Sequence, residues 1–578
     1  MTGPAAPKDP EKARPFFYIL KDKDIFGERQ KDGTGIQFIY ESDGRLINSA
    51  QITGNVTDKE ELTLLETVEG FGRLVHSIGV SVETDRPEET AEFVFQMYGK
   101  KDLYGGGTNL TTSLKCDGME HRIYLSDYRW TEDDHVPGQI KILFAAPERM
   151  GKVSVRLFLN DGYEAPPEEE DLVIDMHSEE YCGMISRSLL QLGNPYRIRK
   201  AIEKSKAGKE VTLAYIGGSI TQGAGAIPIH TECYAYKSFQ LFQNRFSTQN
   251  NVRFIKAGVG GTPSELGMIR FDRDVLREGE RPDIVVIEFA VNDEGDETKG
   301  VCYESLVRKV LKLPWKPAVV LLFSVFANDW NLQERLRPVG DLYDLPMVSI
   351  LNAVTPQFSL KCGEGRILSK NQFFYDIFHP NNTGHTIMAD CLQYLFERCD
   401  AAEPARVGTF VEGMTEEQIL SEKLSGPAVI GADFERIFLL DKKNRYVGAK
   451  IRTGSFTSTD IELQSVEMDG SLTQTPEFPY NWMYDGSRPQ MPGFEMEITC
   501  KSLFLIFKDS GEMDVGKADV FVNDVYCMTA DPHKNNWLHC NAVLLFWETE
   551  SGSHKVRIAV TEEDRNKKFT ILGFGYTI

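Results

Sequence analysis

Short runs of alternating hydrophobic and polar residues fill the first 160 positions. The alternation is clear at residues 35–40, 91–98 and 153–159, and Gly, Asp and Asn separate the runs. A period of two with turn residues between runs predicts an antiparallel β-domain of the sandwich or jelly-roll kind. An acidic segment with a proline pair, residues 161–171, follows and is typical of a linker or a surface crossing.

The pattern then changes to strands that alternate with helices. Uninterrupted apolar runs at 211–216, 283–289 and 318–326 predict strands buried on both faces, whereas 234–246 and 382–399 have helical character. Strands alternating with helices are typical of a parallel sheet. We therefore expect an N-terminal β-domain over residues 1–185 and an α/β domain over residues 186–405.

A second alternating region, clear at residues 518–522 and 555–560, closes the chain. It predicts a C-terminal β-sandwich, jelly-roll-like domain over residues 406–578. Only about fifteen residues, without a Gly/Ser-rich tether, join the last helix of the α/β domain to the helix expected at 415–424. This short connection predicts that the C-terminal domain packs against the α/β domain and helps to form its site.

The composition of the chain limits the classes of partner that we expect it to bind. The chain has 64 Lys and Arg against 86 Asp and Glu, and its formal net charge of −22 repels polyphosphate, so nucleic acid is not an expected partner. No apolar run approaches the roughly 18 residues of a membrane span. The N-terminal residues lack the hydrophobic core of a signal peptide, so we expect no membrane partner and a cytoplasmic location. An export signal removed earlier would leave the same pattern.

The ten cysteines have no paired C-x-x-C spacing, and no Cys/His cluster has the spacing of zinc ligands. We expect them to be mostly buried free thiols. Neither a metal nor a cofactor is predicted.

The candidate catalytic residues directly follow the predicted strands. Ser219, Gly261, Asn292 and the pair Asp376 and His379 each lie just past a strand of the α/β region. Parallel strands end on one edge of their sheet, so these positions should converge in space. A serine needs a base to act as a nucleophile, and His379 is the only histidine at such a strand end. Asp376, three residues earlier, can orient the imidazole, so the set predicts acyl transfer.

Acyl transfer also needs hydrogen-bond donors for the oxyanion of the tetrahedral intermediate. The N–H groups of Ser219 and Gly261 and the amide of Asn292 could supply them. The turn is not the Gly-x-Ser-x-Gly nucleophile elbow, because Thr221 stands where the second glycine belongs. It is not a P-loop either, since no Gly-Lys-Ser/Thr follows.

These blocks, in this order, resemble the SGNH (GDSL-type) hydrolase family: Gly-Gly-Ser-Ile-Thr, Ala-Gly-Val-Gly-Gly, Val-Asn-Asp and Asp-x-x-His-Pro-Asn. The resemblance covers roughly residues 195–400 and implies a flavodoxin-like three-layer α/β/α fold. It assigns the family's four named roles to Ser219, Gly261, Asn292 and His379. Asp376 completes the triad. Gly218 departs from the family pattern, because many members have Asp at this position. This difference affects only the hydrogen bonding expected within the turn.

The family acts on lipids, thioesters, simple esters and acetylated sugars, so the fold does not select the substrate. An SGNH domain beside β-sandwich modules resembles bacterial carbohydrate esterases that deacetylate xylan, mannan or related glycans. The resemblance implies a serine-dependent carboxylic ester hydrolase, an O-acetylesterase, whose partner is an acetylated oligosaccharide or polysaccharide. Trp482 and Trp537 lie among polar residues and could stack on sugar rings, but half-buried core aromatics would give the same pattern.

Two other functions stay open at this point. A lipase, thioesterase or acyltransferase could use the same triad, although no long apolar lid segment lies near Ser219. A glycan-binding protein with an inactive central domain is the other alternative, and the intact Ser219, Asp376 and His379 argue against it.

Overall fold

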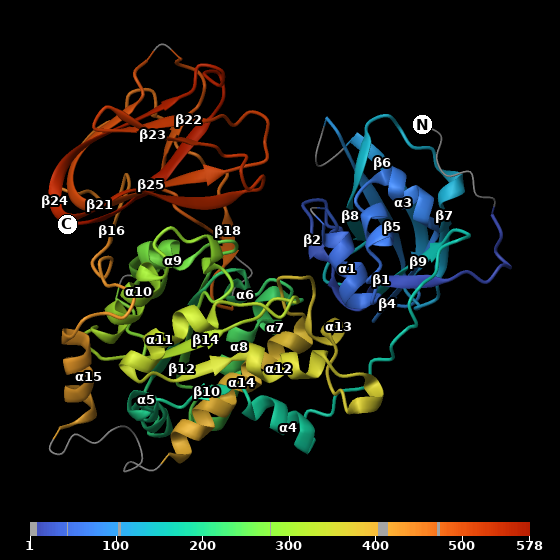
Figure 1. Ribbon diagram of the computed structural model, residues 1–578, viewed down its shortest axis with the longest axis horizontal. Helices are drawn as coiled ribbons and strands as arrows, with labels where there is room; N and C mark the ends of the chain where they lie inside the picture. The colour runs from blue at the N-terminus through green and yellow to red at the C-terminus, as the bar shows by residue number, and fades with distance from the viewer. Residues whose placement is uncertain are drawn as a thin grey trace.

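The computed structural model describes residues 8–42, 44–101, 106–277, 279–402, 414–470, 474–489 and 491–578. A pair of antiparallel sheets, a six-stranded central sheet and an eight-stranded antiparallel sheet follow one another along the chain. In Figure 1 the red C-terminal part lies above the green-to-yellow centre, and the blue N-terminal part lies to the right.

The N-terminal part consists of two sheets that enclose one core. One sheet has the order β1 (Phe16–Phe26), β9 (Met150–Leu159), β4 (Val75–Thr84) and β7 (His121–Tyr124). The other has the order β2 (Glu28–Arg29), β3 (Gly35–Tyr40), β8 (Asp134–Phe144), β5 (Thr90–Gly99) and β6 (Gly106–Lys115). Val80 of β4 and Phe93 of β5 are buried in the same cluster, so the antiparallel β-structure predicted from the alternation is confirmed.

Three helices that the sequence pattern did not predict lie between β3 and β4. They are α1 (Arg45–Thr53), α2 (Lys59–Leu64) and α3 (Val68–Leu74). Asp58 and Thr67 cap α2 and α3 by accepting hydrogen bonds from first-turn N–H groups. Leu46 and Ala50, four residues apart, are the buried residues of α1. An Asp or Thr shortly before a Glu is a helix-start signal. It was overlooked because alternating, strand-like residues precede and follow these helices.

The central sheet has the order β10 (Leu189–Gln191), β15 (Met347–Ser349), β14 (Ala318–Phe323), β13 (Ile284–Glu288), β11 (Val211–Gly217) and β12 (Val252–Gly258). Strands β11 to β15 run parallel, which confirms the predicted parallel sheet. The short strand β10 was not predicted and pairs antiparallel with β15. Counted from β11, the parallel strands have the doubly wound order 2-1-3-4-5, in which ligands bind at the switch point beside the first strand.

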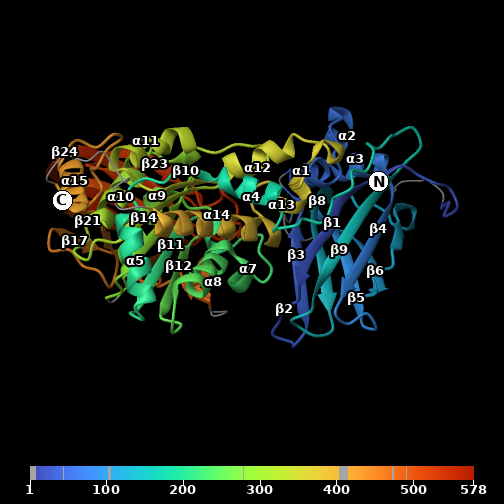
Figure 2. The ribbon, with the colours of Figure 1, turned by 90° about the horizontal axis from the view of Figure 1, so that it is seen from below.

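Both faces of the central sheet are covered. Successive residues of β11 belong to opposite cores: Leu213 and Tyr215 pack in one cluster, Ala214 and Ile216 in the other. This two-sided burial is why the strand is apolar throughout. The first face carries α4 (Glu179–Ser186), α5 (Tyr196–Lys206), α8 (Tyr234–Phe246), α12 (Ile350–Phe358) and α14 (Asn382–Ala401), several of which are seen from below in Figure 2. The second carries α9 (Ser264–Phe271), α10 (Val301–Leu311) and α11 (Gln333–Tyr343).

The boundary predicted at residues 185/186 lies too late in the chain. Tyr181, Met184 and Ile185 of α4 are buried in the core of the central sheet. The Tyr181 hydroxyl also donates to Asp390 of α14 at 2.5 Å. The change from the N-terminal to the central part therefore falls before α4. The boundary predicted at 405/406 falls outside the described residues.

The C-terminal part contains an antiparallel sheet that bends around its own core and a separate pair of strands, β18 (Ser465–Glu467) and β19 (Gln474–Pro476). The strands of this sheet are β16 (Phe438–Leu440), β17 (Ala449–Arg452), β20 (Trp482–Tyr484), β21 (Phe494–Asp509), β22 (Ala518–Val522), β23 (Val525–Ala530), β24 (His539–Val560) and β25 (Phe569–Thr577). The pairing of β21 with β24 shifts between Cys500 and Ser502. Before this shift β21 pairs with β17, and after it with β25. One continuous hydrogen-bonded sheet thus turns a corner, as strands do when two layers share them.

This sheet and the central sheet share a core. Phe434, Phe504 and Leu572 belong to the cluster that covers the second face of the central sheet. Glu304 of α10 accepts hydrogen bonds from three consecutive N–H groups at residues 429–431. The C-terminal part is thus packed on the centre, as the short connection predicted.

All ten cysteines are free and seven of them are buried, which confirms the expectation of mostly buried thiols. In the part of the chain that the structure describes, no helix has the length and apolar character needed to cross a membrane.

Candidate active site

Ser219 lies where β11 ends. Gly217 closes the strand, Gly218 precedes the helix, and Ser219 is the first residue of the short helix α6 (Ser219–Gln222). The first N–H groups of a helix have no partner within it, so the Ser219 N–H is left for other contacts. The sequence therefore places both a hydroxyl and a backbone donor at the carboxyl edge of the sheet.

Ser219, His379 and Asp376 form a continuous hydrogen-bonded chain. The His379 Nε2 lies 2.9 Å from the Ser219 Oγ. The His379 Nδ1 lies 2.9 Å and 3.0 Å from the two carboxylate oxygens of Asp376. The Asp376 Oδ1 also accepts from the backbone N–H groups of Phe378 and His379, at 2.8 Å and 2.9 Å. The carboxylate is thereby fixed independently of the ring that it contacts.

The loop that carries His379 folds back and meets the serine turn. Tyr375 donates its backbone N–H to the carbonyl of His379 at 2.8 Å. Gly225, just past α6, has φ +86°. A Cβ at this position would lie 2.1 Å from the Pro380 carbonyl oxygen and 3.0 Å from the His379 Cβ. Gly225 is therefore needed both for its backbone conformation and for the close approach of the two loops.

The surroundings of Asp376 keep its carboxylate ionised. Burial alone would raise its pKa, but the neighbouring imidazole of His379, its hydrogen bonds and the charge of Arg45 outweigh burial and hold the pKa at about 2. An ionised carboxylate at Nδ1 fixes the tautomer of His379 and leaves Nε2 to accept the proton of Ser219.

The second turn of the site follows β12. Gly261 has φ +71°. Gly260 donates its N–H to the Gln222 Oε1 at 2.8 Å. The Gly261 N–H donates to no atom of the residues that the structure describes. This glycine therefore offers a backbone donor at the position that the sequence predicted.

The C-terminal part holds this turn by its carbonyl oxygens. The Gln464 Nε2 donates to the Gly260 oxygen at 2.9 Å. The His539 Nε2 lies 3.0 Å from the Gly261 oxygen, and its Nδ1 lies 3.1 Å from Asp509. Sequence reasoning missed both contacts, because each joins residues more than 200 positions apart.

Asn292 follows β13, and its amide lies against Gly218. A Cβ at position 218 would lie 2.2 Å from the Asn292 Oδ1 and 2.6 Å from its Nδ2. A side chain at position 218 would therefore displace the Asn292 amide from its present place. Asp293 has a structural role: it accepts from the Ser264 N–H at 2.7 Å and so caps α9.

A buried polar network lies beneath α6. The Thr221 Oγ1 donates to the Glu288 Oε2 at 3.1 Å and lies 2.8 Å from the Tyr234 hydroxyl. Burial raises the pKa of Glu288 to about 7, against the smaller opposite effect of its hydrogen bonds. Sequence reasoning did not consider Glu288, although a carboxylic acid that ends an apolar strand was the available signal.

Arg270, also missed, holds the ends of two strands. Its side chain is fully buried and donates to the carbonyl oxygens of Ala257 at 2.6 Å and Gly217 at 2.7 Å. Asp274 balances its charge at 3.0 Å. The rigid fork of the guanidinium suits this task, since its donors reach two backbones at once.

The two tryptophans proposed to bind substrate have different places. Trp537 is 43% exposed, and a Cβ at Gly261 would lie 2.7 Å from its ring. Trp482 is 4% exposed and packs on Phe494 and Phe574 in the core of the C-terminal sheet. The expectation that Trp482 lines the site was therefore wrong.

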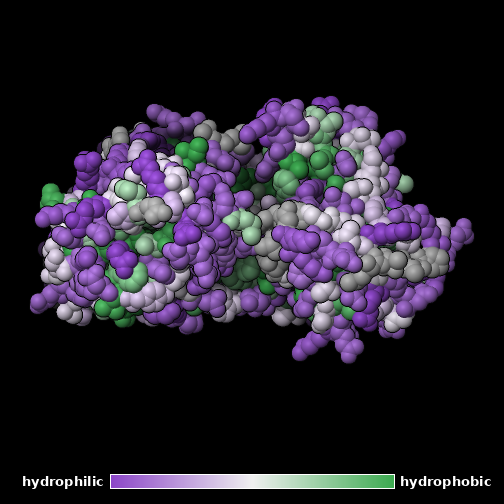
Figure 3. Space-filling model, turned by 90° about the horizontal axis from the view of Figure 1, so that it is seen from above, coloured by the Kyte–Doolittle hydropathy of each residue, from purple (hydrophilic) through white to green (hydrophobic). Residues whose placement is uncertain are grey.

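The surface is hollowed between the two flanking parts in the view from above (Figure 3). Helix α6 lies beneath this gap in Figure 1. Phe378, next to His379, is 38% exposed and packs on Phe326, whose ring stacks with Trp330. The three aromatic side chains, which sequence reasoning missed, form an apolar patch beside the triad histidine.

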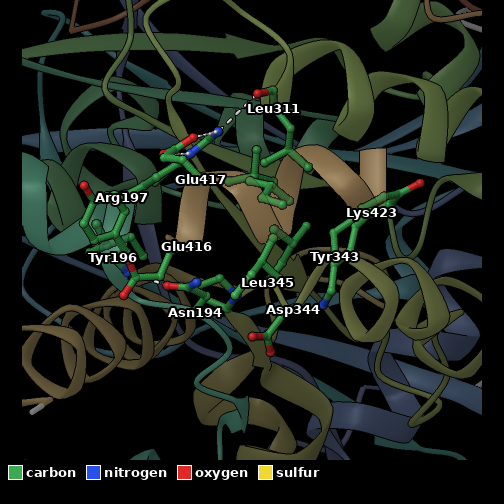
Figure 4. Close-up of a pocket in the computed structure, with 16 residues that line it drawn as sticks. Asn194, Tyr196, Arg197, Leu311, Tyr343, Asp344, Leu345, Glu416, Glu417 and Lys423 are labelled. Atoms are coloured by element: carbon green, nitrogen blue, oxygen red, sulfur yellow. Dashed lines mark hydrogen bonds and ion pairs between the residues drawn. The ribbon is translucent and has the colours of Figure 1, made fainter. Parts of the chain in front are cut away.

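The cavity drawn in Figure 4 lies elsewhere, between α5, α11 and α15 (Glu416–Ser425). Arg197 donates to both carboxylate oxygens of Glu417 at 3.0 Å. Neither Ser219 nor His379 lines this cavity. Its volume of about 40 Å³ leaves room for a few water molecules at roughly 10–15 Å³ each, and not for a sugar.

His385 has a structural role. Burial lowers its pKa to about 3. Its Nδ1 accepts from the Tyr234 N–H at 3.1 Å, and its Nε2 lies 3.1 Å from the Ala224 carbonyl oxygen.

Among the described residues, no group of three or more His, Cys, Asp or Glu is arranged to hold a metal ion.

Residues 215–387 match the model of the GDSL-like lipase/acylhydrolase family, which confirms the resemblance seen in the motifs of this segment. A solved two-domain esterase (CEX) active on acetylated mannans is similar with a TM-score of 0.53 and 23% identity, over 68% of this chain and 98% of its own. Its structure co-crystallised with mannopentaose has a TM-score of 0.52 at the same identity and coverage. These likenesses show the fold. No curated protein matches the chain.

The buried carboxyl groups around the site predict how stability depends on pH. Burial raises the pKa of Glu288 to about 7 and that of Asp293 to about 8. A carboxyl whose pKa is higher in the folded state stabilises the fold below its unfolded pKa and loses this effect as pH rises through the folded pKa. We expect Tm to fall between about pH 5 and about pH 8. Glu288→Gln should flatten part of the fall, and an identical Tm profile in this variant would contradict the assignment.

Proposed function

We propose that the chain is a serine esterase that removes acetyl groups from carbohydrates of the xylan or mannan type. The observation that carries the proposal is the hydrogen-bonded chain Ser219–His379–Asp376, next to the turn of Gly260 and Gly261, where a Cβ at Gly260 would lie 3.8 Å from the Ser219 Cβ. In this proposal the centre is a flavodoxin-like SGNH domain of three α/β/α layers, and the flanking parts are β-sandwich domains.

The geometry supports an acyl-enzyme mechanism. The Ser219 Oγ attacks the acetyl carbonyl carbon while the His379 Nε2 takes its proton, and Asp376 stabilises the imidazolium that forms. The N–H groups of Ser219 and Gly261 and the Asn292 amide stabilise the oxyanion. His379 then gives the proton to the sugar oxygen as its bond to the acyl carbon breaks, and the sugar leaves with a free hydroxyl. Water, activated by the same histidine, attacks the acetyl-serine and releases acetate.

Two features favour a sugar as the leaving group. Trp537 offers an exposed ring beside the oxyanion turn, and a large amphipathic ring suits the apolar face of a pyranose. The similar CEX esterase is active on acetylated mannans and was co-crystallised with mannopentaose.

An ester of a longer acyl chain is the second candidate, favoured by the apolar patch of Phe326, Trp330 and Phe378. The two are separated by rates on p-nitrophenyl esters of increasing chain length, together with acetate release from acetylated xylan and mannan oligosaccharides. Preference for acetate and release from the oligosaccharides support the deacetylase. Preference for octanoate with intact acetylated glycans would support the second candidate.

Removal of either reacting group should abolish the activity. We expect Ser219→Ala and His379→Ala each to lower kcat on p-nitrophenyl acetate by about 10⁶-fold, because nucleophile and base act as one unit. Asp376→Asn should be milder, since Asp376 orients the ring. Ser186→Ala, at an exposed serine of α4, is the matched control. Activity within about tenfold of wild type in either variant would remove Ser219 or His379 from the mechanism.

The amide of Asn292 should contribute to transition-state stabilisation. We expect Asn292→Ala to lower kcat by roughly 10²–10³-fold with little change in KM, since loss of one oxyanion donor costs about 2.7–4 kcal/mol. Steady-state kinetics on p-nitrophenyl acetate measures this. An unchanged kcat would make Asn292 a packing residue for Gly218 alone.

The tryptophan beside Gly261 should matter for sugars only. We expect Trp537→Ala to raise KM for an acetylated oligosaccharide by about tenfold, which equals about 1.4 kcal/mol, and to spare p-nitrophenyl acetate. Trp547→Ala is the matched control, because Trp547 is 41% exposed and packs on Phe434 instead. Equal KM values in the two variants would exclude Trp537 from the sugar site.

A further inference from the structure

The N-terminal part contacts the loop that carries the triad acid and base. Lys23 of β1 donates to the carbonyl oxygen of Phe374. The same ammonium lies 5.6 Å from the centre of the Tyr375 ring, and Tyr375 packs against the N-terminal core. Thr53 of α1 donates to the Asn371 Oδ1 at 3.3 Å. Helix α1 lies beside α13 (Lys370–Phe373) in Figure 2.

Arg45, the first residue of α1, brings a cation to the triad carboxylate. Its Nη1 lies 4.0 Å from the Asp376 Oδ2. Within the described residues, the ion-pair partners of Asp376 are Arg45 and His379. The backbone N–H groups that fix the carboxylate both contact Oδ1. Arg45 therefore acts on the oxygen that the loop itself leaves without a backbone donor.

Two other ionisable groups, Glu41 and Lys23, lie around this carboxylate. Glu41 is buried, its Oε2 accepts from Ser49 at 3.2 Å, and burial raises its pKa to about 8. A protonated Glu41 does not compete for Arg45 at neutral pH. Burial lowers the pKa of Lys23 to about 8, whereas an arginine stays charged at every working pH.

We propose that Arg45 is a positioning residue of the triad, so that the N-terminal domain belongs to the catalytic machinery. Arg45 holds the Oδ2 side of Asp376 and keeps both carboxylate oxygens aligned with the His379 Nδ1. Its charge lies next to the carboxylate that contacts the imidazole. This inference rests on the proposed triad mechanism and goes beyond its substrate.

Two properties follow for the loss of Arg45. The carboxylate loses one restraint, so kcat should fall while KM for a small ester stays unchanged. The Asp376–His379 pair also loses a neighbouring positive charge. The acid limb of the pH–rate profile should then move to higher pH. A residue that only stabilised the fold would not move this limb.

The experiment compares Arg45→Gln, Arg45→Lys and wild type over a pH series. The rate at which a small fluorophosphonate labels Ser219 reports triad reactivity without any natural substrate, and p-nitrophenyl acetate gives kcat and KM. For Arg45→Gln we expect both rates to fall about tenfold, with the acid limb about half a pH unit higher. Arg45→Lys should recover most of the rate, because it keeps the charge, and added guanidinium should partly restore Arg45→Gln.

Arg149→Gln is the matched control, since it breaks an ion pair with Glu89 at 2.7 Å and 2.9 Å within the same N-terminal part. If Arg45→Gln behaves like this control, or loses rate with an unmoved pH profile, the proposal is overturned. Normal labelling of wild type without release of acetate from any glycan would end the carbohydrate proposal, while the labelling rates still decide the role of Arg45. A wild type that neither labels nor hydrolyses overturns both.

Discussion

The hydrogen bonds of the buried Arg270 guanidinium to Gly217 and Ala257 hold together the two turns on which the site depends. One turn carries Ser219 and the other carries Gly261. Strands β11 and β12 pair in parallel as far as Gly217 and Gly258. The guanidinium therefore holds the two strands together where their pairing ends. Burying this charge is costly unless it is paired, and Asp274 pairs it at 3.0 Å.

The same charge network reaches the C-terminal part. Asp274 contacts Arg273 at 2.5 Å, and Arg273 pairs with Glu477, which is fully buried in the C-terminal part. Breaking one member of such a network leaves a charge without a partner, which is more damaging than the loss of a surface pair. The C-terminal part therefore supports the strand ends through charge and, through Gln464 and His539, also holds the turn of Gly260 and Gly261.

The sequence predicted those parts of the structure that depend on local pattern. Strand β11 was predictable because it is apolar on both faces, and Ser219, Gly261, Asn292, Asp376 and His379 were predictable because they follow strands. Arg270 and His539 were not, since their partners lie on other elements. Trp482 and Trp537 sit in similar polar surroundings in the sequence. Only the long-range fold buries the first in a core and leaves the second exposed beside Gly261.

The way each flanking part holds its loop fits the chemistry of that loop. In the proposed mechanism the Gly261 N–H must stay free, and the C-terminal part restrains this turn through the carbonyl oxygens of Gly260 and Gly261. The loop of the acid and base must keep a carboxylate charged and oriented, and the N-terminal part meets it with cations, Lys23 on a backbone carbonyl and Arg45 on Asp376. Each flanking part therefore contacts groups that are not used up in the proposed reaction. The N–H donors and the imidazole of His379 stay available to an ester substrate.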